Sequence, residues 1–155
     1  MNKMMAKHIT GKPEETARVA ENLARAILKK GIGSQAVVVG LSGELGAGKT
    51  TFTQAFAKAL GVKEPVVSPT FILERVYRLP KQTPLSHFVH IDAYRLKGRS
   101  ELFELGWDAL IANPKNIIMV EWADKIGQVL PKDATQLFFS HKGGDKRNIE
   151  VKIQK

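Results

Sequence analysis

Residues 43–50 constrain the fold of this 155-residue chain more than any other segment, because they match the pattern G-x-x-x-x-G-K-[ST] without a mismatch. At average composition such a match arises by chance in on the order of 1% of chains of this length. Residues 36–41 are a short apolar run rich in β-branched residues, which predicts a strand buried on both faces, and a helical pattern begins directly after the motif. The sequence therefore predicts a strand–loop–helix unit.

The residue types of this motif suit a loop that binds phosphate groups. Its glycines let the backbone curl so that successive N–H groups point into one concavity, and the helix that follows adds the positive end of its dipole. Lys49 is placed to reach the outer phosphates as a point charge, and the Thr50 hydroxyl is placed to ligate Mg²⁺. The predicted phosphate-binding residues are Gly43, Gly46, Ala47, Gly48, Lys49, Thr50 and Thr51.

Helical and strand patterns alternate along the rest of the chain. Apolar residues recur at helical spacing after Pro13 and again from Phe52 to Leu60. Strands are predicted at 71–78, 86–92, 116–121, 135–140 and 148–153, and short helices at 100–105 and 107–112. The last two of these strands are expected to form a closing antiparallel hairpin across the glycine turn at 143–144. The first ten residues and the turn at 143–145 are expected to be tail-like. We expect one α/β domain over residues 1–155, a phosphate-loop NTPase three-layer sandwich with a largely parallel central sheet and antiparallel strands at the C-terminal end.

Two predicted strands end in a carboxylate, Asp92 in one case and Glu121 in the other. Carboxyl ends of parallel strands share the edge at which α/β sheets bind ligands, and an NTPase of this kind needs an acid there to hold Mg²⁺, often through water. The run before Glu121 is the more apolar, so we expect Glu121 to be the metal-linked acid and Asp92 to support it or to assist a water. A solvated strand end is the alternative for either carboxylate taken singly.

Several further residues allow two interpretations. Trp122 either packs near a bound nucleotide or fills the core. Arg147 either closes on phosphate or ribose or lies on the surface. His87 and His90 are expected to face opposite sides of one strand, as surface or hydrogen-bonded residues instead of a metal pair. A rigid turn with two hydroxyls is either an ordinary turn or a switch that senses the outermost phosphate; its residues are Ser68, Pro69, Thr70 and Phe71.

The chain carries a formal net charge of +9 and no cysteine. The lack of cysteine excludes a disulfide framework, a thiol nucleophile and a thiolate metal site. The positive balance favours anionic partners, although a solvated basic surface explains it equally well. Apolar runs are far shorter than a membrane span and the first residues lack an apolar signal region, so we expect a soluble cytoplasmic protein with no membrane partner. No Asn/Thr-Lys-x-Asp guanine element is present, which favours adenine by elimination.

A series of short motifs resembles the TsaE (YjeE) family. In order, the motifs are GELGAGKTTF at 43–52, SPTF at 68–71, HIDAYRL at 90–96, ELG at 104–106 and VEW at 120–122. The resemblance implies a small phosphate-loop ATPase of bacterial tRNA threonylcarbamoyladenosine biosynthesis, with ATP and Mg²⁺ as its cofactors. It also implies a partner, the TsaD–TsaB heterodimer, which transfers a threonylcarbamoyl group to adenosine 37 of tRNA. Hydrolysis, weak alone and stimulated by partners, would drive or reset that complex, so tRNA would be met at least indirectly.

The resemblance also implies roles by position. Thr50 and Glu121 would ligate Mg²⁺, and Asp92 would be a catalytic or metal-assisting acid. The residues that would contact the nucleotide besides the loop are Thr16, Trp122 and Arg147, with the segment up to about Thr16 beside the adenine. The turn at 68–71 would be the switch-like element.

Two other functions stay open at this point. A small-molecule kinase needs an arginine-rich lid, and the arginines here are scattered: Arg75, Arg78, Arg95, Arg99 and Arg147. A nucleotide-gated module that binds RNA or protein without significant turnover is favoured by the basic charge and disfavoured by the missing RNA-binding aromatic motif.

Overall fold

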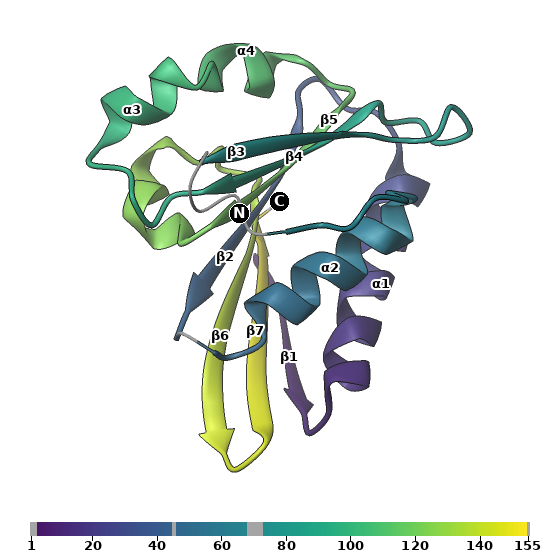
Figure 1. The fold of residues 1–155 in the computed structure, drawn as a ribbon, viewed down its shortest axis with the longest axis vertical. Helices are drawn as coiled ribbons and strands as arrows, with labels where there is room; N and C mark the ends of the chain where they lie inside the picture. The colour runs from purple at the N-terminus through teal and green to yellow at the C-terminus, as the bar shows by residue number, and fades with distance from the viewer. Residues whose placement is uncertain (1–2, 45, 68–72, 155) are drawn as a thin grey trace.

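The structure, a computed structural model, describes residues 3–44, 46–67 and 73–154 (Figure 1). Within these ranges seven strands form one sheet in the order β1-β7-β6-β2-β5-β4-β3. They are β1 (Lys3–Thr10), β2 (Val37–Gly43), β3 (Glu74–Arg78), β4 (His87–Asp92), β5 (Asn116–Glu121), β6 (Thr135–Gly143) and β7 (Lys146–Gln154). β4, β5, β2 and β6 are parallel to one another, whereas β3, β7 and β1 pair antiparallel. The chain is therefore a mixed α/β protein with a parallel centre and antiparallel edges.

Helices cover both faces of this sheet (Figure 1). α1 (Pro13–Lys30) and α2 (Lys49–Leu60) pack on one face. α3 (Arg99–Glu104), α4 (Trp107–Ala112) and the 3₁₀ segment η1 (Ala123–Val129) pack on the other. No helix in the described part of the chain is both long and apolar enough to cross a membrane.

The β5 strand shows how the sequence fills both layers, because all six of its residues are buried. Ile117 and Met119 belong to the α1/α2 core, and Ile118 and Val120 belong to the α3/α4 core. This alternation follows from the two-residue period of a strand, and a strand covered on both faces needs apolar residues at every position. Glu121 continues the Ile117–Met119 side, so its carboxylate faces α2.

A cluster of aromatic rings fixes α2 on the sheet. Phe52 lies 5.5 Å from Phe139 of β6 and 6.1 Å from Phe56, and Phe56 lies 5.9 Å from Phe88 of β4 (ring centroids). Each of these side chains is at most 1% exposed. Burial of one such ring stabilises the fold by about 1.5–3 kcal/mol. The start of α2 is therefore held firmly beside the carboxyl ends of β2, β4 and β5.

Most of the predicted elements are confirmed, with boundaries shifted by up to three residues; residues 71 and 72 of the strand predicted at 71–78 lie outside the described residues. The expectation for the first ten residues is wrong, because 3–10 form β1, which pairs with β7 from Lys3↔Gln154 to Thr10↔Arg147. The antiparallel hairpin predicted across the turn near residue 144 is confirmed, because β6 and β7 pair antiparallel on either side of it; the turn is ordered as their tight end and is not tail-like. Gly143 and Gly144 adopt positive φ angles of 110° and 56°, which lets both strands run further than their apolar patterns suggested.

Candidate functional site

The loop between β2 and α2 forms a concavity lined by main-chain groups. Gly46 and Gly48 adopt φ angles of 75° and 104°, a region that L-residues with a Cβ rarely enter. Gly48 is the N-cap of the 12-residue α2, and no described side chain caps this end of the helix. Ala47 is fully buried, and its N–H donates to the carbonyl oxygen of Glu44 (3.3 Å). The first N–H groups of α2 are thus open to an anion, as the positive end of a helix dipole requires.

Lys49 is buried at the first position of α2, with 6% of its surface exposed. Its Nζ donates a hydrogen bond to the carbonyl oxygen of Gly43 (2.8 Å) and lies 3.7 Å from the centroid of the Trp122 ring. Burial lowers the pKa of Lys49, and the carboxylates of Glu121, Asp124 and Asp92 act in the opposite direction. Burial is the largest of these effects, so the ammonium charge lacks sufficient compensation within the protein.

Asp92 and Glu121 lie side by side at the carboxyl ends of β4 and β5, where they are register partners. Both are buried, with 5% and 7% of their surface exposed. Oδ1 of Asp92 accepts a hydrogen bond from the main-chain N–H of Tyr94 (2.9 Å). Oε2 of Glu121 lies 2.9 Å from Nε2 of His90. The two strand-end carboxylates therefore converge on the edge where Lys49 sits.

A cavity of about 450 Å³ opens beside the loop. Its walls come from the β1–α1 corner, from the loop and the start of α2, and from the β6–β7 hairpin. The lining residues are Thr10, Gly11, Lys12, Pro13, Thr16, Gly46, Gly48, Thr51, Asp145 and Arg147. The volume lies within the about 300–1,000 Å³ typical of small-molecule sites. Within the β1–α1 corner, the hydroxyl oxygens of Thr10 and Thr16 lie 2.9 Å apart and connect the end of β1 to α1.

The structure gathers the predicted site residues into two adjoining groups. In the first group the Trp122 ring contacts the Lys49 ammonium, and Glu121 and Asp92 act on it electrostatically. The second group lines the cavity: Thr16, Gly46, Gly48, Thr51 and Arg147. The Thr50 hydroxyl belongs to an exposed residue in the first turn of α2, and Gly43 contributes its carbonyl oxygen. The predicted switch residues 68–71 lie outside the described residues.

The structure places Trp122 against the core and against Lys49. Its ring contacts Lys49 and also packs against the α3/α4 core, and Tyr94 covers it at 5.0 Å between centroids. Its φ angle of 59° is unusual for a residue with a side chain. Arg147 is half-buried in the cavity wall, where its Nη1 donates to the carbonyl oxygens of Gly144 and Lys146 (3.3 and 3.2 Å).

Sequence reasoning missed two residues of this site. Asp124 acts electrostatically on Lys49, and its N–H donates to Oγ of Ser42 (3.1 Å), which ties η1 to β2. Its position in a loose D-x-x-G pattern was too unspecific to single it out. His90 was expected to be a surface or a hydrogen-bonded residue; it is buried and its Nε2 contacts Glu121, a partner that the sequence did not indicate. The side chains of His90 and Glu121 lie together because of the parallel register of β4 and β5.

The fold and this loop define a class of α/β proteins, in which a G-x-x-x-x-G-K-[ST] loop joins a central parallel strand to a helix at an acidic strand edge. Within that class, the profile of the family described as "Threonylcarbamoyl adenosine biosynthesis protein TsaE" matches residues 10–149. The chain belongs to the TsaE family.

Individual relatives agree with this assignment. The tRNA threonylcarbamoyladenosine biosynthesis protein TsaE of Bacillus subtilis (strain 168) is 39% identical over 140 residues, which cover 90% of this chain and 80% of that protein. The TsaE protein of Rickettsia bellii is 31% identical over 152 residues, 97% of each chain. The crystal structure of YdiB from Bacillus subtilis superimposes with a TM-score of 0.72 at 31% identity, over 99% of this chain and 88% of that one.

Proposed function

We propose that this chain is a magnesium-dependent ATPase of tRNA threonylcarbamoyladenosine biosynthesis, built as a single phosphate-loop domain of the three-layer type over residues 1–155. One observation carries the proposal: the Lys49 ammonium is buried beside an uncapped helix N-terminus and faces the carboxylates of Glu121, Asp124 and Asp92. Such a group has a site for a polyphosphate on one side and a site for a cation on the other. The TsaE names of the relatives supply the biosynthetic context.

The nucleotide would bind with its phosphates on the loop and its adenosine in the cavity. The N–H groups from Gly46 to Thr51 would donate to phosphate oxygens, and Lys49 would exchange the Gly43 carbonyl and the Trp122 ring for the outer phosphates. The cavity extends from this loop to Thr16 and Arg147, which suits a nucleoside attached to those phosphates. Arg147 would give up its main-chain acceptors for ribose or phosphate oxygens.

The donor set at the sheet edge fits Mg²⁺. Thr50 offers an exposed hydroxyl, and Oε1 of Glu121 is hydrogen-bonded by no described residue. In nucleotide sites Mg²⁺ is typically coordinated by only a few protein oxygens, one of them charged, and phosphate and water oxygens complete its coordination shell. When bound, the cation neutralises negative charge on the phosphates during transfer.

The two strand-end carboxylates would divide the chemistry. Glu121 would support the metal, and Asp92 would orient the attacking water and accept its proton. The N–H of Tyr94 fixes Oδ1 of Asp92, so the carboxylate is held in one orientation before substrate arrives. Lys49 would stabilise the charge that develops on the transferred phosphoryl group.

The partner in this proposal is the TsaD–TsaB heterodimer, and tRNA is met at least through that complex. ATP turnover should be slow for the isolated chain and should rise when the heterodimer and substrate tRNA are added together. Lys49→Ala should abolish both the basal and the stimulated rate, because it removes the charge that holds the phosphates. Normal turnover in Lys49→Ala, or ATP-dependent phosphorylation of a small acceptor in place of hydrolysis, would overturn the proposal.

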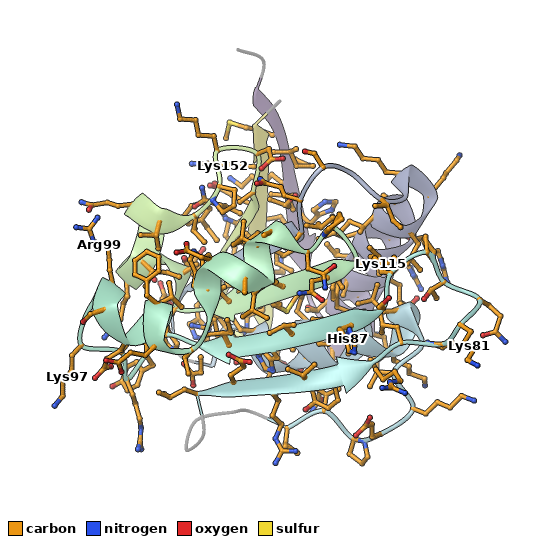
Figure 2. All side chains as sticks on the ribbon, turned by 90° about the horizontal axis from the view of Figure 1, so that it is seen from above. Lys81, His87, Lys97, Arg99, Lys115 and Lys152 are labelled. Atoms are coloured by element: carbon orange, nitrogen blue, oxygen red, sulfur yellow. The ribbon has the colours of Figure 1, made fainter. Side chains whose placement is uncertain are left out.

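One observation favours a second function, an RNA-binding module. A cavity of about 390 Å³ near the start of β4 is lined by three cationic side chains, Arg78, Lys81 and Lys115, together with His87 and no carboxylate. Figure 2 shows Lys81, His87 and Lys115 on the same part of the surface. These cations form no ion pair with any described residue. They are therefore available to phosphate groups of a nucleic acid backbone.

The salt dependence of tRNA binding tests this second function. Three phosphate contacts predict a slope of about −2 to −3 in log affinity against log salt concentration. The double variant Lys81→Glu/Lys115→Glu should lose most of that slope. The control Lys7→Glu/Lys142→Glu reverses two exposed lysines away from this cavity and should keep it. Equal slopes in both variants would contradict an RNA site here.

A further inference from the structure

His90 is a buried imidazole directly behind the strand-end carboxylates. It is 2% exposed and lies on β4 two residues before Asp92, on the side of the sheet that faces α2. Its ring stacks on Phe88, with 6.1 Å between centroids and an interplanar angle of 13°. Its Nε2 lies 2.9 Å from Oε2 of Glu121. The ring is thus held on one face by packing and at one edge by a single polar contact.

The contact with Glu121 defines the direction of the hydrogen bond. An ionised carboxylate only accepts, so Nε2 of His90 carries the proton and donates it. The other ring nitrogen, Nδ1, is buried and has no hydrogen-bond partner among the described residues. A buried polar atom without a partner costs free energy. Packing alone would favour an apolar residue at this position, so the Nε2–H must serve another purpose.

We propose that His90 is a positioning residue for Glu121. Its Nε2–H fixes Oε2 and thereby leaves Oε1 as the oxygen offered to Mg²⁺. This inference rests on the proposed function, because it requires the cation site at the sheet edge. Groups that hydrogen-bond a metal ligand from behind typically change metal affinity by about 10–100-fold when they are replaced.

The length of a substituted amide separates positioning from packing. In His90→Gln the side-chain amide can reach the place of Nε2 and donate to Glu121. In His90→Asn the amide is too short to do so, although its polarity is the same, and His90→Leu removes the donor altogether. If His90→Leu fails to fold, the Asn and Gln variants still form a matched pair. Thermal denaturation of each variant controls for stability.

The decisive measurement is the Mg²⁺ concentration that gives half of the magnesium-induced increase in ATP affinity, with ATP affinity in EDTA as the second readout. We expect His90→Asn and His90→Leu to raise this half-maximal Mg²⁺ concentration at least 10-fold. His90→Gln should stay within about threefold of the wild type, and ATP affinity in EDTA should change less than twofold in all three variants. Equal Mg²⁺ dependence of the Asn and Gln variants would overturn the inference, as would a parallel loss of affinity in EDTA.

A double-mutant cycle gives an independent check. In a Glu121→Gln background His90→Asn should produce no further change in Mg²⁺ dependence, because the group that it positions is already altered. Additive effects would contradict coupling through Glu121. Failure of the proposed function gives a different result from failure of this inference. If the wild-type chain binds no ATP with or without Mg²⁺, the proposed nucleotide site is wrong. If the wild type binds ATP and the His90 variants keep its Mg²⁺ dependence, only the role of His90 is wrong.

Discussion

Lys49 occupies contacts that a phosphate group can replace. Its ammonium is held by one carbonyl oxygen, that of Gly43, and by the face of the Trp122 ring. Both are weaker partners for a charge than a phosphate oxygen is. Burial lowers the pKa of Lys49 because the ammonium loses its hydration. The negative charge of a bound polyphosphate would favour the charged form and raise this pKa again. The residue is therefore preorganised for an anion instead of being satisfied by the protein.

This pKa direction predicts weaker ATP binding at alkaline pH. Because the pKa of Lys49 in the folded chain lies below 10.5, the ammonium is lost earlier than in an ordinary lysine as pH rises. The unfolded chain then binds more protons than the folded one, so the contribution of Lys49 to the free energy of unfolding increases with pH in this window. ATP affinity, which needs the charged form, should decrease. Titrations of the wild-type chain at several pH values test this: its ATP affinity should decrease as pH rises, and an affinity that does not change with pH would contradict the prediction.

Trp122 should report nucleotide binding through its fluorescence. Lys49 has to leave the Trp122 ring to reach phosphates, which changes the charge near the indole. The other tryptophan, Trp107, is 3% exposed in the core on the opposite face of the sheet. Addition of ATP should therefore change the emission of Trp107→Phe but not that of Trp122→Phe. The reverse pattern would show that the nucleotide binds elsewhere.

At the scale of elements, the β2–loop–α2 unit depends on how closely β2 approaches β6. Gly43 and Phe139 are register partners, and a Cβ at Gly43 would overlap the carbonyl oxygen of Phe139. The φ angle of Gly43 is 125°, which also disfavours any side chain. Glycine at this position is therefore required by the sheet as well as by the loop.

Gly43→Ala should destabilise the protein by about 2–4 kcal/mol, because the main chain of β6 has to move. Gly46→Ala is the matched control: its φ is also positive, but no described atom lies within 4 Å of the added Cβ. That variant should lose only about 1–2 kcal/mol from backbone strain. Urea denaturation measures both, and equal losses would contradict the close contact between Gly43 and β6.

The sequence predicted the parallel centre of the sheet and its two terminal carboxylates well, because β2 and β5 carry uninterrupted apolar runs. It did not predict β1, whose residues lack such a run and are ordered by pairing with the exposed edge of β7. Without β1 the cavity could not be predicted, because β1 places Thr10 beside Arg147 and so brings the β1–α1 corner next to the β6–β7 hairpin. The pairing of His90 with Glu121 was equally hidden, because it depends on the register of two strands far apart in sequence.

At the scale of the whole molecule, the nucleotide edge and the basic cavity lie at opposite ends of β4. From His87 to Asp92 the strand extends about 17 Å, at about 3.3 Å per residue. In the proposed function the strand-end carboxylates would hold Mg·ATP at one end of β4, and the basic cavity at the other end would stay accessible to another anionic surface. The net charge of +9 is consistent with positively charged side chains at both ends of β4.

This separation predicts that the two ends can be altered independently. Lys81→Glu/Lys115→Glu should leave the affinity for Mg·ATP within about twofold, because at this distance surface charges are largely screened at physiological salt. Any tRNA binding by the isolated chain should likewise survive Lys49→Ala. A large loss of nucleotide affinity in the charge-reversed variant would show that the two ends are coupled.

Isothermal titration calorimetry with Mg·ATP is the direct test of nucleotide binding at Lys49. We expect a saturable heat for the wild-type chain with one nucleotide per protein, and no measurable heat for Lys49→Ala at the same concentrations. A wild-type titration without heat at several temperatures, or an isotherm for Lys49→Ala equal to that of the wild type, would contradict it.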